Sequence, residues 1–491
     1  MIDILHKRRA GILLHITSLP GAGENGDFGP EAYNFVDFLH SIGASVWQTL
    51  PLNMPHGDGS PYQCLSAHAG NPALINFDWL VKKGWLTRHE ACMNCGGTKG
   101  FERSCRITRA YYGFLLNADS DDKKDFAQFC SEKKSWLDGF ALFLALRNEF
   151  DQSCWNQWPE QFKLRNLSAL NEAKRRLGSE IESIKFEQYV FFTQWNELRH
   201  YAAQKGVLLF GDIPIFVSYD SADVWEHPEV FKLDENREMS VVAGVPPDYF
   251  SETGQRWGNP HYDWSYLKKT GFQWWVERMR TQIEMFDIIR IDHFRGLEAA
   301  WEIPADEPTA VNGCWVKAPG KALLRAIFNA FGPIALVAED LGIITDEVEE
   351  LRDYFELPGM KILQFAFGGD HDNPYLPGNL DKNCVVYTGT HDNDTTLGWY
   401  NGISDGEKAY IYEYLGQPTT SMPFTLVQAA LASVANLAVI PMQDVLELGS
   451  EHRMNTPGTT EKNWRWRFDW SQLTEEQVHR LAHAIDLFAR N

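Results

Sequence analysis

Three stretches of the sequence decide the fold: IIRIDHFRG (288–296), LVAEDLG (336–342) and VVYTGTHDND (385–394). In each of them a short apolar run is followed by acidic residues, first among them Asp292, Glu339 and Asp392. Catalytic residues of (β/α)₈ barrels come from the C-terminal ends of several parallel strands. Glycoside chemistry uses a pair of carboxyl groups in opposite protonation states. The three stretches therefore predict a barrel enzyme that breaks and remakes sugar linkages.

The rest of the chain repeats the same pattern. Short apolar runs that end in polar residues, Gly or Pro predict eight buried parallel strands, at 11–16, 45–51, 207–214, 287–294, 334–342, 360–367, 384–392 and 437–446. Helical patterns lie between most of them, which is typical of βα units. We therefore predict an α/β protein with a (β/α)₈ TIM barrel.

The spacing of the strands predicts where long segments are inserted into the barrel. The long gap after the second strand is rich in helical pattern, so we expect an inserted helical subdomain at 52–205. A second insertion, at 215–285, contains the irregular stretch GVPPDYFSETGQRWGNP (244–260). Insertions into βα loops stand at the catalytic face. We expect one catalytic barrel over 1–491, with residues 244–260 as an active-site lid.

The composition indicates which kinds of molecule the protein binds. The net charge of −21 argues against nucleic-acid binding, which needs basic surface. No run of 18 apolar residues appears, and the apolar stretch GILLHI (11–16) is better explained as a first strand than as a signal peptide. We therefore expect a cytoplasmic protein without a membrane partner. The 18 Trp, 17 Tyr and 30 Phe weakly favour a carbohydrate, because aromatic rings match the apolar faces of sugars.

The eight cysteines do not predict a metal site. Cys92 and Cys95 form the only close pair, and a zinc site would want a second pair of ligands, for which His89 is the sole nearby candidate. Free thiols in a reducing compartment are the simpler interpretation. We expect neither a metal nor a cofactor.

The strand ends suggest roles for the acidic residues. Alternation places Arg290 and Asp292 on the same side of their strand, where the guanidinium favours the ionised carboxylate. An isolated Arg–Asp pair would be structural, but the other strand ends favour a nucleophile. Glu339 has two reasons to keep its proton, burial and neighbouring acids, and this suits a general acid. Asp392 either stabilises positive charge at the anomeric carbon or only forms an Asx turn.

Other polar and aromatic residues lie near predicted strand ends. Asp212 ends the third strand and could bind a hydroxyl. Tyr62 and Ser60 lie on a Gly-rich loop after the second strand, where the Tyr ring could stack on a sugar or simply pack. Trp257 lies between turn residues in the lid, and Asn463 follows the last strand.

With these residues in view, the chain resembles the amylomaltases, the 4-α-glucanotransferases or disproportionating enzymes of glycoside hydrolase family 77 in the α-amylase superfamily. The matching motifs, in family order from about residue 10 to 470, are SPYQ, FGDIPIF, the lid stretch, RIDHFRG, AEDLG, GTHDNDT and NTPGTTEKNWRWR. The resemblance implies that Asp292 is the nucleophile, Glu339 the general acid/base and Asp392 the transition-state stabiliser. It implies glucan contacts by Tyr62, Ser60, Asp212, Arg290, His293, Gln255, Trp257, Asp340, Asp370, His391 and Asn463.

The implied reaction is transfer of α-1,4-glucan segments between maltooligosaccharides or starch-type glucans by retaining double displacement. An α-amylase-type hydrolase would share the carboxylates, but the lid sequence and the lack of a predicted C-terminal β-domain disfavour it. A noncatalytic glucan-binding protein would need no acid/base pair. The sequence leaves open a monomer or a small homo-oligomer, and it leaves open the preferred length of donor and acceptor.

Overall fold

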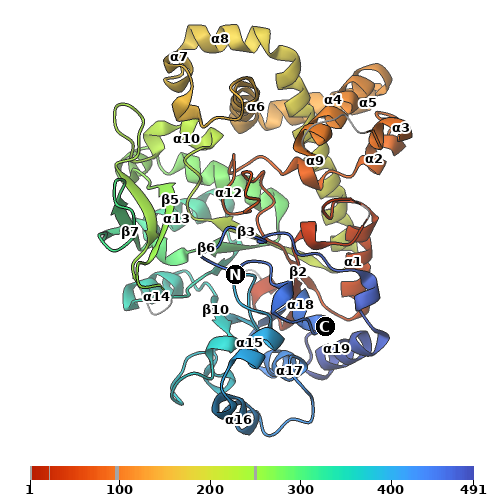
Figure 1. Cartoon of the computed structure of the whole chain (residues 1–491), viewed down its shortest axis with the longest axis vertical. Helices are drawn as coiled ribbons and strands as arrows, with labels where there is room; N and C mark the ends of the chain where they lie inside the picture. The colour runs from red at the N-terminus through yellow and green to blue at the C-terminus, as the bar shows by residue number, and fades with distance from the viewer. Residues whose placement is uncertain (1–2, 22, 94–98, 248–250) are drawn as a thin grey trace.

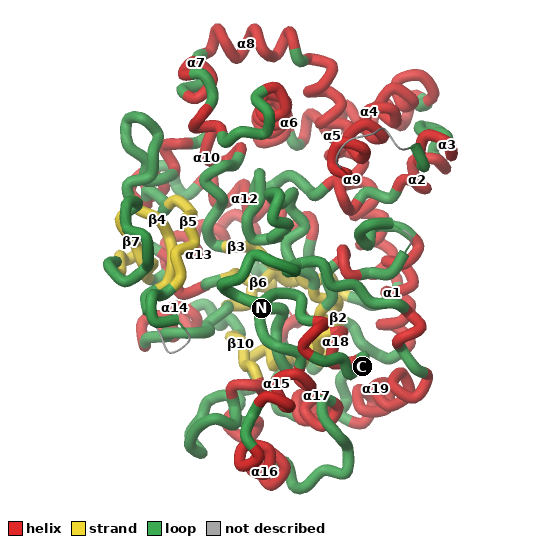
Figure 2. Tube along the Cα trace, in the orientation of Figure 1, coloured by secondary structure: helices red, strands yellow, loops and turns green. Residues whose placement is uncertain are grey.

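The structure, a computed structural model, describes residues 3–21, 23–93, 99–247 and 251–491. Eight parallel strands form its central sheet in the order β10-β11-β12-β1-β2-β3-β6-β9. The sheet curves so that its two edges meet, where the Ala338 N–H in β9 donates to the carbonyl of Pro358 just before β10 (2.9 Å). The predicted (β/α)₈ barrel is confirmed, and Figures 1 and 2 show its strands in the middle of the molecule.

All eight predicted strands are present in the predicted order, although most are shorter than their apolar runs. Their bounds are β1 (Arg9–Leu13), β2 (Val46–Gln48), β3 (Leu208–Pro214), β6 (Ile288–Asp292), β9 (Ala335–Ala338), β10 (Gly359–Ile362), β11 (Cys384–Tyr387) and β12 (Leu437–Pro441). The acidic residues Glu339 and Asp392 lie beyond the last residue of their strands. They are therefore on the loops that leave the barrel at its C-terminal face.

The interior of the barrel changes from apolar to polar along each strand. Near the start of the strands, Phe210 and Ile288 are register partners and belong to a fully buried apolar cluster. Two residues further on, the partners are Asp212 and Arg290. Because side chains alternate across a strand, these polar groups point into the same interior as the apolar ones below them. The barrel thus has an apolar floor and a charged upper end.

A second, antiparallel sheet lies beside the barrel and was not predicted. Its order is β5-β4-β7-β8, and its bounds are β4 (Val241–Val245), β5 (Gln255–Pro260), β7 (Ala299–Pro304) and β8 (Cys314–Lys317). The predicted lid at 244–260 is therefore mostly one hairpin of this sheet rather than irregular chain; residues 248–250 lie outside the described part. The alternating pattern of a half-buried strand is weak here, because β5 changes from exposed to buried along its length and β8 is largely exposed.

Nineteen α-helices lie within the described residues. Those on the barrel and after its strands are α1 (Pro30–Ser41), α10 (Ala222–Glu226), α11 (Trp264–Lys269), α12 (Gln273–Met285), α13 (Gly320–Phe331), α14 (Asp346–Tyr354), α15 (Thr396–Gly402), α16 (Asp405–Tyr414), α17 (Phe424–Ala432), α18 (Met442–Val445) and α19 (Glu475–Leu487). Those between β2 and β3 are α2 (Phe77–Lys82), α3 (Arg88–Ala91), α4 (Lys99–Asn117), α5 (Ser120–Glu132), α6 (Lys134–Glu149), α7 (Glu160–Lys163), α8 (Leu167–Arg176) and α9 (Gly178–Gln204). None of the described helices is long and apolar enough to cross a membrane.

The helical segment between β2 and β3 stands away from the barrel at one end and returns to it through α9 (Figure 1). Near its C-terminus α9 packs on α1, where the rings of Tyr201 and Tyr33 lie 5.0 Å apart. The last part of α9 is thus in the position of an ordinary barrel helix. We therefore propose that the inserted subdomain ends within α9 rather than at residue 205. Cys95, one of the two clustered thiols, lies outside the described residues.

Arg490 ties the end of the chain into the base of the barrel. Its guanidinium is fully buried and donates to the carbonyls of Leu431 (2.5 Å), Ser433 (3.0 Å) and Arg9 (3.0 Å). Two of these carbonyls lie at the C-terminus of α17, where the helix dipole favours a cation. The third carbonyl belongs to β1. Arg490 follows the last helix, α19, so its side chain connects that helix to α17 and to β1.

Replacing Arg490 by Met should lower the free energy of unfolding by about 3 kcal/mol, because several buried carbonyls lose a charged donor at once. Differential scanning calorimetry or denaturant titration would measure the change. Arg88→Met is the matched control, since Arg88 pairs with Asp78 at the surface, where its side chain is 71% exposed, and such pairs contribute about 0–1 kcal/mol. Equal effects of the two substitutions would contradict the assignment.

Candidate active site

Arg290 is the centre of the polar upper end of the barrel. It lies on β6, opposite Asp212 of β3 in the strand register. One guanidinium nitrogen, Nη1, contacts Asp212 Oδ2 at 2.5 Å, and the other, Nη2, contacts Asp292 Oδ1 at 2.8 Å. The predicted side of the strand is thus correct, and Arg290 bridges two carboxylates instead of one. These charge-assisted contacts fix the carboxylates relative to each other.

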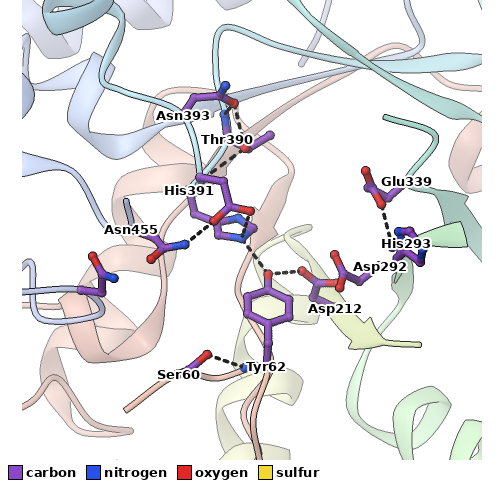
Figure 3. Close-up of polar contacts among 12 residues, drawn as sticks. Ser60, Tyr62, Asp212, Asp292, His293, Glu339, Thr390, His391, Asn393 and Asn455 are labelled. Carbon is purple, nitrogen blue, oxygen red and sulfur yellow. Dashed lines mark hydrogen bonds and ion pairs between the residues drawn. The ribbon is translucent and has the colours of Figure 1, made fainter. Parts of the chain in front are cut away.

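A hydrogen-bonded chain crosses the barrel mouth from Asp212 to His391 (Figure 3). The Tyr62 hydroxyl donates to Asp212 Oδ2 at 2.8 Å and lies 2.9 Å from His391 Nε2. Because the hydroxyl gives its one proton to Asp212, His391 Nε2 must be the donor to the Tyr62 oxygen. The two rings are also stacked, 5.3 Å apart. The loops after β2 and β11 are thereby joined to β3.

Asp292, the last residue of β6, is partly open to solvent. Its side chain keeps 28% exposure, whereas the Asp212 side chain has none. Burial raises the pKa of the Asp292 carboxyl, the Arg290 guanidinium counteracts this, and the carboxylates of Asp212, Glu339 and Asp392 raise it further. Asp292 is therefore an accessible carboxylate that depends on Arg290 for its charge.

Glu339 is the second reactive carboxyl. Burial raises its pKa to about 7, with opposing effects from Arg290 and from the backbone N–H groups of His293 and Leu341. Those N–H groups donate to Oε2 at 2.6 Å and to Oε1 at 3.2 Å. A carboxyl with this pKa keeps a large protonated fraction at neutral pH, which a general acid requires.

His293 connects the two carboxyls through its backbone. It follows Asp292 directly and has φ 52°, in the left-handed region that residues other than glycine seldom adopt. Such a conformation costs about 1–3 kcal/mol, and eleven other described non-glycine residues of the chain also have positive φ. Here it turns the N–H of His293 toward Glu339 (Figure 3). The strained turn after β6 thus orients the acid that follows β9.

Asp392 lies on the turn after β11, and the tail that follows the barrel holds it in place. The amide of Asn455 donates to Asp392 Oδ1 at 2.6 Å, and Arg453 donates to the Asp392 carbonyl at 3.0 Å. The turn itself is closed by Asn393, whose Oδ1 accepts from the Thr390 N–H at 2.8 Å. The Asp392 carboxylate itself accepts from Asn455 rather than from a backbone N–H of its own turn. Its side chain is 46% exposed, and its Oδ2 lies 3.4 Å from His391 Nε2.

The lid hairpin reaches the site through Trp257. Its ring packs edge-on against His293 at 4.9 Å, and its indole N–H donates to Gln255 Oε1 at 3.1 Å. The base of the hairpin is fixed to the Tyr62 loop, because the Gln63 amide donates to Asn259 Oδ1 at 3.0 Å. The part of β5 that carries Trp257 is therefore held over the barrel mouth.

The structure brings together most of the predicted site residues, but not all of them. Asp340 is buried, accepts from the Met360 N–H (2.7 Å) and pairs with Arg352 (2.5 Å), so its carboxylate faces the protein and not the site. The glucan contact implied for Asp340 stays a prediction, and we propose that the residue instead packs α14 on β10. The side-chain amide of Asn463 bonds within its own loop. Its oxygen accepts from the Thr456 N–H (3.0 Å), and its nitrogen donates to the Thr459 carbonyl (2.8 Å).

The last two predicted residues are Ser60 and Asp370. Ser60 supports Tyr62, because its hydroxyl accepts from the Tyr62 N–H at 3.4 Å. Asp370 is exposed on the loop that follows β10. Both remain candidates for a glucan contact at the rim.

Sequence reasoning missed Asn455 and Trp464. Both lie in the stretch MNTPGTTEKNWRWRF, from which only Asn463 was selected. The Trp464 ring lies 5.8 Å from Tyr62 and 6.0 Å from His391. The stretch has neither helical nor strand periodicity, so nothing in it marks which side chains turn inward.

No group of three or more His, Cys, Asp or Glu side chains suited to a metal occurs in the described ranges. The acidic residues at the barrel mouth are already engaged by Arg290 and by backbone N–H groups. The expectation of a metal-free reaction therefore stays a prediction, which chelator treatment would test.

Two carboxyl groups with different electrostatic surroundings, at the C-terminal face of a (β/α)₈ barrel, define a carbohydrate-active barrel enzyme. The family model described as 4-alpha-glucanotransferase, that of glycoside hydrolase family 77, matches residues 14–474. The chain belongs to this family, and it is an enzyme of the 4-α-glucanotransferase class. The family resemblance of the sequence motifs is thereby confirmed.

The relatives align with this chain over nearly its whole length. A 4-alpha-glucanotransferase of Thermus thermophilus is 48% identical, over 96% of this chain and 97% of its own length. The chloroplastic/amyloplastic 4-alpha-glucanotransferase of Solanum tuberosum is 44% identical, over 94% and 82%. The solved amylomaltase of Streptococcus agalactiae in complex with acarbose is 37% identical and superposes with a TM-score of 0.95, over 99% of this chain and all of that one.

Proposed function

We propose that the enzyme transfers segments of α-1,4-glucans by retaining double displacement. Asp292 attacks the anomeric carbon while the Glu339 carboxyl gives its proton to the departing glycosidic oxygen. The bond from carbon to that oxygen breaks as the bond to Asp292 forms, and the released glucan leaves with the proton. The observation that carries this proposal is the unequal pair of carboxyls, one with Arg290 as its ion-pair partner and one with a pKa of about 7.

In the second half of the reaction Glu339, now ionised, removes the proton from the 4-hydroxyl of an incoming glucan. That oxygen attacks the anomeric carbon and displaces Asp292, so the configuration is inverted twice and retained overall. Asp392 stabilises the positive charge that develops on the sugar in both transition states. Water competes with the glucan as acceptor, and the lid hairpin over the mouth favours transfer by limiting its access.

Several buried atoms are positioned for sugar hydroxyls. Asp212 Oδ1, Arg290 Nε and His293 Nε2 have no hydrogen-bond partner within the described part of the chain. Burial lowers the pKa of His293 to about 3, so its ring is neutral. Unpaired buried polar atoms are costly unless a ligand satisfies them. We propose that donor hydroxyls complete these three hydrogen-bonding sites, and that acarbose, which the Streptococcus agalactiae amylomaltase binds, occupies the same place.

The test of this proposal is incubation with maltotriose and sizing of the products. We expect glucose together with oligosaccharides longer than maltotriose, all with α linkages in the NMR spectrum. Glucose and maltose without longer chains would indicate a hydrolase. Binding without turnover would indicate a noncatalytic glucan-binding protein.

Trp257→Ala should shift the outcome from transfer toward hydrolysis. A glucan acceptor needs a stacking surface, whereas water does not, so the ratio of free reducing ends to transferred chains should rise by about two- to fivefold. The ratio is measured at fixed donor concentration. Trp257→Phe is the matched control, because it keeps a flat ring but loses the N–H bonded to Gln255. If the alanine variant kept the wild-type ratio and rate, Trp257 would only pack against His293.

A further inference from the structure

Asp444 is a buried carboxylate that the proposed mechanism does not use. It lies on α18, directly after β12, and it is 2% exposed. Its Oδ2 accepts from the hydroxyls of Thr388 (2.5 Å) and Thr396 (2.6 Å), and its Oδ1 accepts from the Thr396 N–H (2.8 Å). Burial raises its pKa, and the three donors counteract this. Its three hydrogen bonds thus go to two residues of one loop.

Those two residues are the ends of the loop that carries His391 and Asp392. Thr388 is the first residue after β11, Thr396 begins α15, and both have no exposed surface. Within the loop Asn393 closes a turn, and Gln364, Ser450 and Arg453 bond to its middle from other parts of the chain. The Asp444 carboxylate, on the helix that follows the neighbouring strand, bonds to both ends of the loop.

We infer that Asp444 is a positioning residue for the reaction, which holds the loop 388–396 so that His391 and Asp392 face the donor sugar. The inference rests on the proposed function of Asp392. Asn455 holds the Asp392 side chain, and Asp444 holds the Thr388 hydroxyl and the Thr396 N–H at the two ends of the loop. Loss of Asp444 frees these ends, whereas the contacts of Ser450 and Arg453 with the middle of the loop remain.

The test is a double-mutant cycle read as acarbose affinity, because calorimetric titration requires no turnover. The four proteins are the wild type, Asp444→Asn, Asp392→Asn and the double variant. Asn keeps the shape of Asp444 but replaces one acceptor oxygen with a donor. We expect Asp444→Asn to weaken binding about tenfold in the wild type and less than about twofold when Asp392 is already replaced, since contacts in one network are not additive.

A second pair of variants covers the case in which Asp444→Asn does not fold. Thr388→Val removes one hydroxyl donor with almost no change in shape, and Thr388→Ser keeps the hydroxyl. Binding should weaken in the Val variant and remain near wild type in the Ser variant. Asp287→Asn is the control for a general loss of stability, because Asp287 accepts from the Leu209 N–H (2.8 Å) at the opposite end of the barrel. It should lower the melting temperature and leave acarbose binding unchanged.

The outcomes distinguish the positioning role of Asp444 from the proposed role of Asp392. Equal losses of affinity from Asp444→Asn in both backgrounds, or equal effects of Thr388→Val and Thr388→Ser, would overturn the positioning role while Asp392 stays in the site. If Asp392→Asn alone bound acarbose as well as the wild type, the role of Asp392 would fall, and the positioning role would fall with it.

Discussion

Asp292→Asn should reduce maltotriose turnover at least about a thousandfold, because an amide cannot form the covalent glycosyl intermediate. The variant also removes one of the two carboxylates that compensate Arg290, so its folding should be checked by circular dichroism. Product formation is followed by sizing of oligosaccharides over long incubations. Turnover near the wild-type rate would rule out Asp292 as the nucleophile.

Asp340→Asn is the matched control for this experiment. Like Asp292, Asp340 is acidic and contacts an arginine, yet its carboxylate faces Arg352 and the Met360 N–H. We expect the control to lower the melting temperature and to change kcat by less than about threefold. A loss comparable with that of Asp292→Asn would place Asp340 among the glucan-binding residues.

Glu339→Gln should lower maltotriose turnover by about 10²–10⁴-fold, the usual contribution of a general acid. A donor such as α-maltosyl fluoride leaves without protonation, so the first release of fluoride should be reduced by only about tenfold or less. Rapid-quench measurement of fluoride in the first turnover separates this step from the second, which still lacks its base. Equal losses with both donors would contradict the assignment.

The wild type and Glu339→Gln also test the pH dependence of the reaction. Glu339 acts as an acid only while protonated, so kcat/KM with maltotriose should fall as pH rises through about 7, the pKa of this carboxyl in the free enzyme. At the acidic limb Asp292 gains a proton, and burial places that limb above the ordinary range of an aspartate. With the fluoride donor, Glu339→Gln should lose the alkaline limb of the first step. An alkaline limb that persists there would assign it to another group.

The sequence by itself determined the barrel and its three carboxyls. Alternating βα patterns produced the eight strands in order, because a buried parallel strand must be apolar on both faces and therefore stands out. The alternation of side chains placed Arg290 beside Asp292, and the change from apolar to acidic residues at the strand ends marked the catalytic face. These are local signals, and each is complete within about ten residues.

Tertiary structure alone decided which polar residues beyond the strands face the site. Asp340 adjoins Glu339 in the sequence but turns toward Arg352, whereas Asn455 comes 63 residues after Asp392 and bonds to it. The lid forms a hairpin because β5 pairs with β4, which in turn pairs with β7, and a small buried cluster of Val242, Ile303 and Ala310 lies in that region. Likewise, no pattern near Asp444 reveals that it closes the loop of Asp392. Such contacts depend on where the chain returns after the barrel has closed, and that information is distributed over the whole fold.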